Sequence, residues 1–274
     1  MPELPEVETI RRNLQATIVN SRIITIDVHD VRLGRPIQPD QLQKWAVGHR
    51  IVSFARRAKY IIVHLDNDAA IIIHLGMSGR LGVLPASAHV EKHTHVIFHL
   101  DDNRQLRYRD PRRFGLIEIT LPGAIESYAG FAKLGVEPLS AAFNAQFLAD
   151  HLPKSKKAIK LWIMDAQNIV GIGNIYANEA LFFAGLHPAR PAASLNRVEQ
   201  RKLTDSIKST LERALQLGGT TIRDFQNTHG EPGFFQQVLS VYQREGEKCK
   251  NCGTAIIKVV VGGRSTFFCP VCQK

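Results

Sequence analysis

Residues 249–272, CKNCGTAIIKVVVGGRSTFFCPVC, decide how the C-terminal end of this chain folds. They hold all four cysteines, arranged as two Cys-x2-Cys pairs with sixteen residues between them: Cys249, Cys252, Cys269 and Cys272. In this spacing each tight turn presents two thiolates, and the chain between them brings the pairs together as a tetrahedron. We therefore predict a zinc finger holding one structural Zn2+, since four thiolates leave no open coordination position.

The residues between the cysteine pairs fit a β-hairpin. Residues 256–261 are mostly β-branched, Gly262 and Gly263 provide a turn, and residues 266–268 return. Arg264 is then displayed at the tip of the hairpin, where it can touch a phosphate. Two disulfides are the competing interpretation, but a chain with no export signal is expected to stay reduced.

Size and charge narrow the class of protein. A chain of 274 residues, 44% hydrophobic, is long enough for two domains and a small appendage. Its apolar runs are shorter than the roughly 18 residues of a membrane span, and its start lacks signal-peptide features. We expect a cytoplasmic protein with no membrane partner. The formal charge of +10 and the pI near 9.6 indicate a polyanionic partner, with solubility alone as the alternative.

Upstream of the finger, the chain changes from strands to helices. Val7, Ile10, Leu14 and Ile18 recur at helical spacing and predict a leading helix that ends near Ile18. Short β-rich runs then predict an antiparallel sandwich or flattened barrel. These runs are residues 23–28, 50–54, 60–65, 70–75, 95–100, 105–108 and 116–120.

Helical periodicity dominates after residue 142. It covers residues 158–168, 174–184 and 196–217. In the last segment Asn196 and Glu199 have capping-box spacing, and Gly218-Gly219 is a stop signal.

The residues after Met1 offer a candidate nucleophile. Removal of Met1 exposes Pro2 as a secondary amine, which can condense with an aldehyde-level sugar carbon and remain a charged iminium. Such an α-amino group has a pKa of about 7.7 to 8.0, so part of it is neutral near pH 7. Glu3 is close enough to exchange protons with the bond that is attacked. The alternative is that Pro2 and Pro5 merely start the helix.

Two further motifs have both a chemical and a structural interpretation. Residues 171–174, GIGN, are either an anion site at a helix N-terminus or an ordinary helix connection. Residues 109–115, RDPRRFG, are either a loop that inserts into a nucleic-acid duplex or a solvated basic turn.

Three single residues are equally open to two interpretations. Met77, in a Gly-rich turn, is either a wedge or a filler of a core gap. His74 fits a core histidine but is retained as a candidate DNA contact. Lys59 follows two arginines and opens a hydrophobic strand.

In combination these features resemble the bacterial formamidopyrimidine-DNA glycosylases over the whole chain and in the right order. The resemblance rests on residues 2–9, Lys59, Met77, residues 110–115, residues 173–176 and the cysteine motif. It implies an α+β multidomain fold with an N-terminal β-sandwich and leading helix, a helix-two-turn-helix domain and a four-cysteine zinc finger. The expected boundaries are 1–134 for the sandwich, 135–150 for a linker, 151–235 for the helical domain and 240–274 for the finger.

The resemblance also implies an activity. The family removes 8-oxoguanine and formamidopyrimidines from damaged double-stranded DNA and cuts the strand by β,δ-elimination. Pro2 would attack C1′ of the flipped nucleotide and form a Schiff base, while Glu3 handles protons. Lys59 matches the lysine assigned to β-elimination, and Arg264 matches the finger arginine of the δ-elimination step.

The same correspondence implies the DNA contacts. Met77, Arg112 and Phe114 would fill the gap left by the flipped base, with Arg112 facing the orphaned cytosine. Residues 218–225 resemble the loop that covers the extruded base. The remaining expected DNA contacts are His74, His93, Lys156, Asn174 and Tyr242. We expect a monomer that needs no nucleotide cofactor and associates with the nucleoid through DNA.

The sequence departs from the family pattern at two positions, and two other functions remain open. Gln243 stands where many relatives have glycine, and Leu161 where they often have proline. An endonuclease VIII-like glycosylase for oxidised pyrimidines is the nearest rival, although that branch tends to have glycine where this chain has Leu4. A non-catalytic zinc-finger protein that binds DNA is the other.

Overall fold

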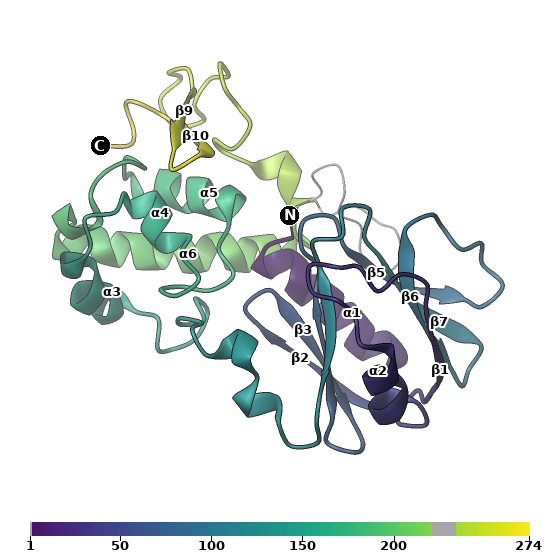
Figure 1. Cartoon of the computed structure of the whole chain (residues 1–274). Helices are drawn as coiled ribbons and strands as arrows, with labels where there is room; N and C mark the ends of the chain where they lie inside the picture. Colours follow the sequence, from purple (N-terminus) through teal and green to yellow (C-terminus); the bar gives the residue numbers. More distant parts are fainter. Residues whose placement is uncertain (1, 221–233) are drawn as a thin grey trace. The chain divides into compact units, whose positions relative to one another are not determined.

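The computed structural model describes residues 2–220 and 234–274, and the chain divides into two compact units. Unit 1 comprises Met1–Ala132 and Leu217–Phe234, and unit 2 comprises Lys133–Gln216 and Phe235–Lys274. Figure 1 traces the elements of each unit. A search of the described helices finds none that combines the length and the apolar character needed to cross a membrane.

Unit 1 is built on two four-stranded antiparallel sheets, with strand orders β1-β6-β7-β5 and β2-β3-β4-β8. The strands are β1 (Ile23–Val28), β2 (Ile51–Arg57), β3 (Tyr60–Leu65), β4 (Ala70–His74), β5 (Arg80–Pro85), β6 (Thr94–Leu100), β7 (Arg104–Arg109) and β8 (Leu116–Thr120). The predicted sandwich is confirmed. Strand β5 was not expected, because Gly82 and Pro85 weaken its propensity; it is an edge strand, where proline is tolerated.

Two helices close the open sides of this sandwich. Helix α1 (Leu4–Ile18) contacts β2 and β5, which are edge strands of different sheets. Helix α2 (Pro39–Ala46), which the sequence analysis did not predict, contacts the opposite edges, β1 and β8. The predicted apolar stripe of α1 is buried in the core that both sheets share. The N-terminal turn of the chain is therefore anchored to the sandwich.

Unit 2 contains the other helices and the finger. The helices are α3 (Ala145–His151), α4 (Ile159–Ile163), α5 (Asn174–Ala184) and α6 (Arg197–Gln216). Helix α5 packs against α6, α4 and the finger strand β10 (Arg264–Phe268). The predicted capping box is confirmed, since Asn196 N donates to Glu199 Oε2 at 2.9 Å and Glu199 N to Asn196 Oδ1 at 3.0 Å. Short 3-10 helices are Ile125–Ser127 and Ala129–Phe131 in unit 1 and Leu152–Lys154, Ala192–Ser194 and Phe235–Val238 in unit 2.

The helix expected over residues 158–168 is shorter than predicted. Helix α4 ends at Ile163, and Asp165 Oδ1 accepts a hydrogen bond from Gln167 N at 3.0 Å, which forms a turn. Beyond that turn the backbone pairs with a distant segment, because Gly135 N donates to Ala166 O at 2.8 Å. A local turn and a long-range partner therefore replace the helical hydrogen bonds.

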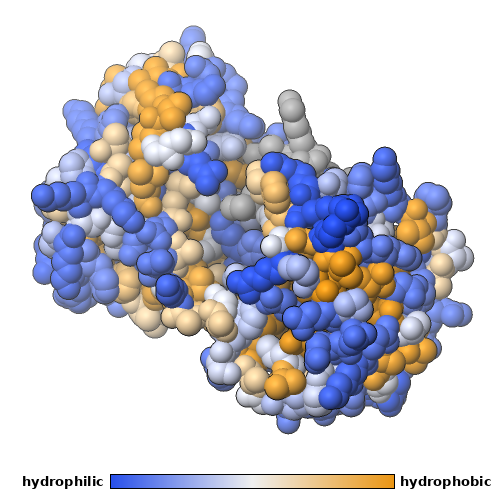
Figure 2. Space-filling view, viewed as in Figure 1, coloured by the Kyte–Doolittle hydropathy of each residue, from blue (hydrophilic) through white to orange (hydrophobic). Residues whose placement is uncertain are grey.

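The predicted hairpin of the finger is confirmed. Strand β9 (Ile257–Val261) pairs antiparallel with β10 through a turn in which Gly262 and Gly263 have φ of 55° and 72°. Left-handed backbone at both turn positions matches the right-handed twist of a two-residue hairpin. Figure 2 shows an apolar surface over this hairpin, and Val259 and Val260 are exposed on it.

Candidate functional site

The N-terminal turn of unit 1 is held by a buried carboxylate. Pro2 and Glu3 are buried, and Glu3 is the N-cap residue of α1. Glu3 N donates to Glu6 Oε2 at 2.8 Å, while Glu6 Oε1 accepts a hydrogen bond from Thr220 N at 2.7 Å. A Cβ on Gly219 would lie 2.9 Å from Glu6 Oε1, so the two segments approach closely. Glu6, which the sequence analysis did not single out, therefore fixes the turn that carries the candidate nucleophile.

Lys59 lies in the tight turn between β2 and β3. Its neighbour Ala58 has a left-handed φ of 54°, and Arg56 donates to Ala58 O at 2.8 Å. Arg56 also pairs with Glu8 in α1, with Nε and Oε2 3.2 Å apart. This ion pair places the end of β2 beside the first turns of α1. The structure thus brings Lys59 to the same side of unit 1 as the N-terminal turn.

His74 ends β4 opposite Tyr60, and the two ring centroids are 4.8 Å apart. Burial and then the charge of Lys59 lower the pKa of His74 to about 4. The neutral ring accepts a hydrogen bond at Nδ1 from Gly76 N at 3.0 Å. His74 is therefore a hydrogen-bonded histidine that supports the turn leading to Met77.

Met77, Arg112 and Phe114 lie on two turns that touch each other. A Cβ on Gly76 would lie 2.5 Å from the carbonyl carbon of Phe114 and 2.5 Å from Gly115 N, so only glycine permits this approach. Met77 is 38% exposed and Phe114 is 55% exposed. The Arg112 guanidinium lies 4.9 Å from the centre of the Phe114 ring. The three residues predicted to act together are thus presented together to solvent.

Asp110 holds the second of these turns from inside. It is fully buried, and its Oδ1 accepts hydrogen bonds from Ser78 Oγ at 2.6 Å and from Arg112 N at 3.3 Å. Its Oδ2 accepts from Gly115 N at 2.9 Å, and its own N–H donates to His93 O at 3.0 Å. Asp110 therefore fixes the backbone beside three predicted DNA-contact residues. Its position within a basic motif could have identified it, because a lone acid among arginines suggests an internal anchor.

Residues with left-handed backbone also lie at or next to the predicted site residues. Seven non-glycine residues in the described part of the chain have positive φ, and three of them are Asn or Asp, which tolerate it. The other four are Ala58, His93, Arg113 and Gln243. Each is a predicted site residue or the immediate neighbour of one. Backbone strain of this kind concentrates at functional sites, where the surrounding fold enforces it.

In unit 2 one carbonyl of β10 joins the helices to the finger. Ser265 O accepts a hydrogen bond from Asn174 Nδ2 at 2.9 Å and from Lys160 Nζ at 3.0 Å. Lys160 is fully buried, and its Nζ also donates to Thr266 Oγ1 at 2.7 Å. Arg264, the preceding residue, is exposed. Asn174 and the fingertip are therefore held in one arrangement by Lys160, which the sequence analysis missed.

Tyr242 is fixed by another buried carboxylate. Glu179 of α5 is fully buried and accepts hydrogen bonds from Ser240 N, Val241 N and Tyr242 N at 2.8, 2.9 and 2.9 Å. Lys156, by contrast, is exposed and makes no side-chain hydrogen bond or ion pair within the described residues.

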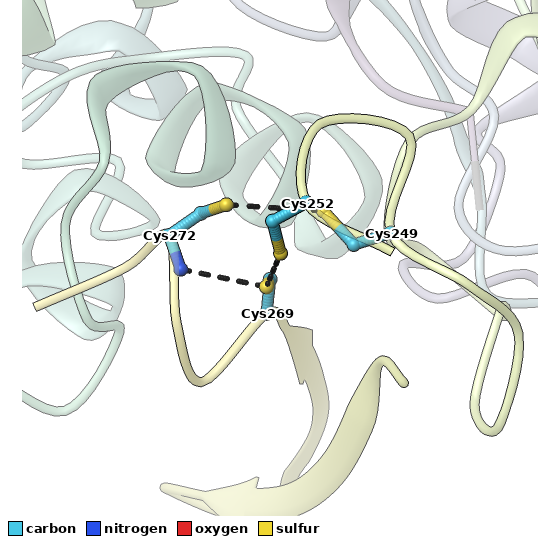
Figure 3. A group of neighbouring side chains, drawn as sticks. All are labelled: Cys249, Cys252, Cys269 and Cys272. Carbon is cyan, nitrogen blue, oxygen red and sulfur yellow. Dashed lines mark hydrogen bonds between the residues drawn. The ribbon is translucent and has the colours of Figure 1, made fainter. Parts of the chain in front are cut away.

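The four cysteines converge as the spacing predicts (Figure 3). Their sulfur atoms all lie within 4.8 Å of one another, with Cys249 and Cys272 3.9 Å apart and Cys252 and Cys269 3.4 Å apart. Sulfurs at the corners of a tetrahedron around zinc are about 3.8 Å apart, given a Zn–S distance of about 2.3 Å. Backbone N–H groups of Asn251 and Cys272 point at two of the sulfurs. The donor set fits one structural zinc ion.

Family models cover most of the chain. The N-terminal domain of formamidopyrimidine-DNA glycosylase matches residues 1–117, and the H2TH domain of that enzyme matches residues 134–226. A zinc finger found in FPG and IleRS matches residues 246–274. The chain belongs to the formamidopyrimidine-DNA glycosylase family.

Whole-length relatives agree with this family. Formamidopyrimidine-DNA glycosylase of Laribacter hongkongensis is 45% identical over 274 residues, which covers 100% of both chains. Wild-type Lactococcus lactis Fpg bound to DNA containing N7-benzyl-Fapy-dG is 37% identical, with a TM-score of 0.92 and 100% coverage of both chains. Lactococcus lactis Fpg bound to DNA with an abasic site also has a TM-score of 0.92, with 37% identity and 99% coverage of both chains.

The departures from the glycosylase pattern are accommodated by the fold. A Cβ on Gly262 would lie 2.6 Å from Leu161, so this leucine of α4 packs directly against the hairpin turn. Gln243 adopts φ of 59°, a conformation that suits glycine better. The segment expected to cover an extruded base, residues 218–225, lies outside the described residues from position 221 onward.

Proposed function

We propose that this protein is a bifunctional DNA glycosylase and AP lyase of base excision repair that removes oxidised purines from double-stranded DNA. Its membership of the glycosylase family supports a base excision repair function. The observation that carries the proposal is the buried turn Pro2-Glu3, pinned by Glu6 in the same unit as Lys59. A basic chain, with a formal charge of +10, suits a DNA substrate.

The proposed chemistry begins with Pro2 after Met1 has been removed. The lone pair of the Pro2 nitrogen attacks C1′ of the flipped nucleotide, and the bond from C1′ to the base breaks. The base leaves with a proton, and the amine loses its own. The C1′–O4′ bond then opens, Glu3 supplies a proton to O4′, and an iminium links Pro2 to the sugar.

Strand cleavage follows from this iminium. Loss of a C2′ proton expels the 3′ phosphate in the β-elimination, in which we assign Lys59 a role. A second elimination expels the 5′ phosphate, and Arg264 neutralises the charge on that phosphate. Anchoring of the adjacent Ser265 by Asn174 and Lys160 supports this role for Arg264, because the fingertip is held rigidly.

The remaining predicted residues are proposed to bind the duplex. Met77 and Phe114 enter the gap left by the flipped base, and Arg112 faces the unpaired cytosine. Their joint exposure and the Arg112–Phe114 stacking support this assignment. The proposed phosphate and backbone contacts are His74, His93, Lys156, Asn174 and Tyr242. We also propose the domain boundaries given above, a monomer without a nucleotide cofactor, and a cytoplasmic, nucleoid-associated location.

Borohydride trapping tests the nucleophile. Wild-type protein should become covalently fixed to a duplex containing 8-oxoguanine, because reduction of the iminium is irreversible. Pro2→Gly, which replaces the secondary amine with a primary one, should lose nearly all trapping and strand cleavage, whereas Pro5→Gly, a change in the same turn that leaves the secondary amine intact, should retain both. Mass spectrometry of each sample confirms that Met1 is absent. Undiminished cleavage by Pro2→Gly would exclude Pro2 as the nucleophile.

Substrate comparison tests the two rival functions. Duplexes carrying 8-oxoguanine, a formamidopyrimidine or an oxidised pyrimidine, each opposite all four bases, should be cleaved with a preference for the purine lesions. Faster cleavage of the pyrimidine lesion would favour an endonuclease VIII-like enzyme. Tight binding with no trapping on any lesion would favour a non-catalytic DNA-binding protein.

A further inference from the structure

Gln243 is a strained residue whose side chain the fold does not use. Its φ of 59° places a residue with a Cβ in the left-handed region. The side chain is exposed and has no hydrogen-bond partner among the described residues. Its conformation is therefore unfavourable for glutamine, yet no intramolecular contact compensates for the strain. Because this backbone strain is not offset by a contact within the chain, it points to a role in binding another molecule.

The residues on both sides of Gln243 are firmly held. Tyr242 N donates to the buried carboxylate of Glu179 at 2.9 Å. On the other side Arg244 donates to Ser240 O at 2.7 Å and pairs with Glu247 at 2.8 Å. Because both neighbours are fixed, the direction in which the Gln243 side chain leaves the backbone is fixed as well. The backbone at Gln243 therefore needs no ordering when a ligand binds, and only the side-chain rotamers have to be fixed.

The surroundings of Gln243 suit an anionic ligand. An open hollow of about 470 Å³ is lined by Tyr242, Gln243, Glu245, Lys258, Ser265 and Phe267. A second open hollow, of about 400 Å³, also includes Tyr242 and Gln243, and Lys250 contributes to its wall. Gln243 thus lines two hollows that together carry Lys250, Lys258 and Arg244 against Glu245 and Glu247.

The acid in the first hollow is already paired. Glu245 Oε2 lies 3.4 Å from Lys258 Nζ, and the Lys258 side chain is 40% exposed. Ser265, on the far wall, is the residue whose carbonyl binds Asn174 and Lys160 beside the exposed Arg264. The first hollow is therefore lined by Tyr242 and Gln243 and also by Ser265, the neighbour of Arg264.

We propose that the Gln243 carboxamide binds the DNA backbone by donating an Nε2–H hydrogen bond to a non-bridging phosphate oxygen near the one contacted by Tyr242. The inference rests on the proposed function and adds to it a further contact with the DNA backbone. Glutamine is among the side chains that commonly bind phosphate oxygens, and such contacts position DNA without reading its sequence. The contact is neutral, so it releases no counterion and adds affinity without changing the dependence on salt.

Replacement of Gln243 by glycine separates binding from folding, because it should weaken DNA binding without lowering the stability of the fold. Gln243→Gly relieves the left-handed strain, so its unfolding midpoint should equal or exceed that of the wild type. Its Kd for a duplex should nevertheless be about 3- to 10-fold weaker, the effect of one lost hydrogen bond. The loss should be the same for lesion-containing and undamaged duplexes of different sequence. The slope of log Kd against log salt should not change.

Two further variants sharpen the measurement. Gln243→Asn keeps a residue that tolerates positive φ but shortens the side chain, so its Kd should weaken as in the glycine variant. Lys258→Ala removes a cation in the same hollow and should make the salt slope shallower by about 0.9 if Lys258 contacts a phosphate. A neutral and a charged contact are thus distinguished in one set of titrations.

The outcomes separate this inference from the function on which it rests. Wild-type protein that traps lesion DNA, with Gln243→Gly and Gln243→Asn binding equally well, would refute the phosphate contact alone. A loss of affinity that varies with DNA sequence would show a base contact and also refute it. Wild-type protein that neither traps nor binds lesion DNA would overturn the proposed function and this inference together.

Discussion

Buried acids organise the candidate site. Glu6, Asp110 and Glu179 are each no more than 1% exposed, although glutamate and aspartate are rarely buried unless they have partners. Each accepts backbone N–H groups from a segment that holds a predicted site residue. Carboxylates that accept several N–H bonds are strong, charge-assisted anchors. The residues proposed to act on DNA or to bind it are thus positioned by acids that are themselves buried.

Replacement of Asp110 tests this anchoring. We expect Asp110→Asn to lower the free energy of unfolding by about 2 to 4 kcal/mol, because an amide cannot accept hydrogen bonds at both of its ends and leaves a buried donor unpaired. Ser78→Ala, which removes only one partner, should cost about 1 kcal/mol. Urea denaturation measures both, and lesion cleavage by Asp110→Asn should fall because the turn carrying Arg112 is displaced. Wild-type stability in Asp110→Asn would contradict the assignment.

The lowered pKa of His74 predicts a loss of stability in acid. The group has a pKa of about 4 when folded and 6.5 when unfolded, so the unfolded chain takes up the proton first as the pH falls. Its contribution is complete above pH 6.5 and should decline by up to about 3 kcal/mol between pH 6.5 and pH 4.

The control is His74→Gln, which keeps an acceptor for Gly76 N but does not titrate. Because the variant lacks the titrating ring, free energies of unfolding measured at several pH values should show the wild type losing up to about 3 kcal/mol relative to His74→Gln as the pH falls from 6.5 to 4. Parallel curves would show that His74 contributes nothing to the pH dependence.

The hairpin and α4 act as one structural element. Only one residue of the turn Gly262-Gly263 packs against α4. A Cβ on Gly262 would lie 2.6 Å from Leu161, whereas a Cβ on Gly263 would have nothing within 4 Å. Both glycines have left-handed φ, so an alanine at either position is strained. The two positions differ in packing and share the same backbone requirement.

Alanine at the two turn positions should therefore have unequal effects. Gly263→Ala should destabilise unit 2 by about 1 kcal/mol through backbone strain. Gly262→Ala should cost up to about 1 kcal/mol more, because the added methyl displaces the side chain of Leu161. Leu161→Ala in the Gly262→Ala background should recover much of the difference. Thermal unfolding measures the stability of all three variants. Equal losses of stability for Gly262→Ala and Gly263→Ala would show that the hairpin turn does not pack against α4.

At the level of the whole chain, the finger belongs to unit 2 and shares its cluster of buried residues with helix α5. Its cluster of buried residues includes Phe182 of α5 together with Phe267 and two of the cysteines. Unit 1 has its own core, built from both sheets, α1 and α2. Loss of the metal should therefore spread into unit 2 and spare unit 1.

Removal of a zinc ligand tests this division. Wild-type protein should contain one zinc per chain, and Cys249→Ser should lose the metal, because three thiolates bind it far less tightly than four. DNA binding should be lost, while hydrogen exchange in β3 and β4 remains slow. An active Cys249→Ser protein without metal would refute the structural role, and rapid exchange throughout unit 1 would refute the independence of the two cores.

Features encoded by residues close together along the chain could be predicted from sequence. The cysteine spacing, the apolar stripe of α1 and the capping box of Asn196 and Glu199 need only neighbouring residues, and all three are confirmed. The candidate site residues were predicted in the same way, because they belong to short motifs, and their roles stay predictions. A spacing rule works here because backbone geometry alone places such residues on one face or in one turn.

The supports of the site could not be predicted, because their partners are remote in sequence. Glu179 binds a backbone N–H 61 residues away, and Lys160 binds a carbonyl 105 residues away. The early end of α4 and the pairing of β5 likewise depend on hydrogen bonds to segments that are distant in sequence, which local propensity cannot predict. A buried charge is stable only where distant donors or acceptors converge on it, and that convergence exists only once the chain has packed.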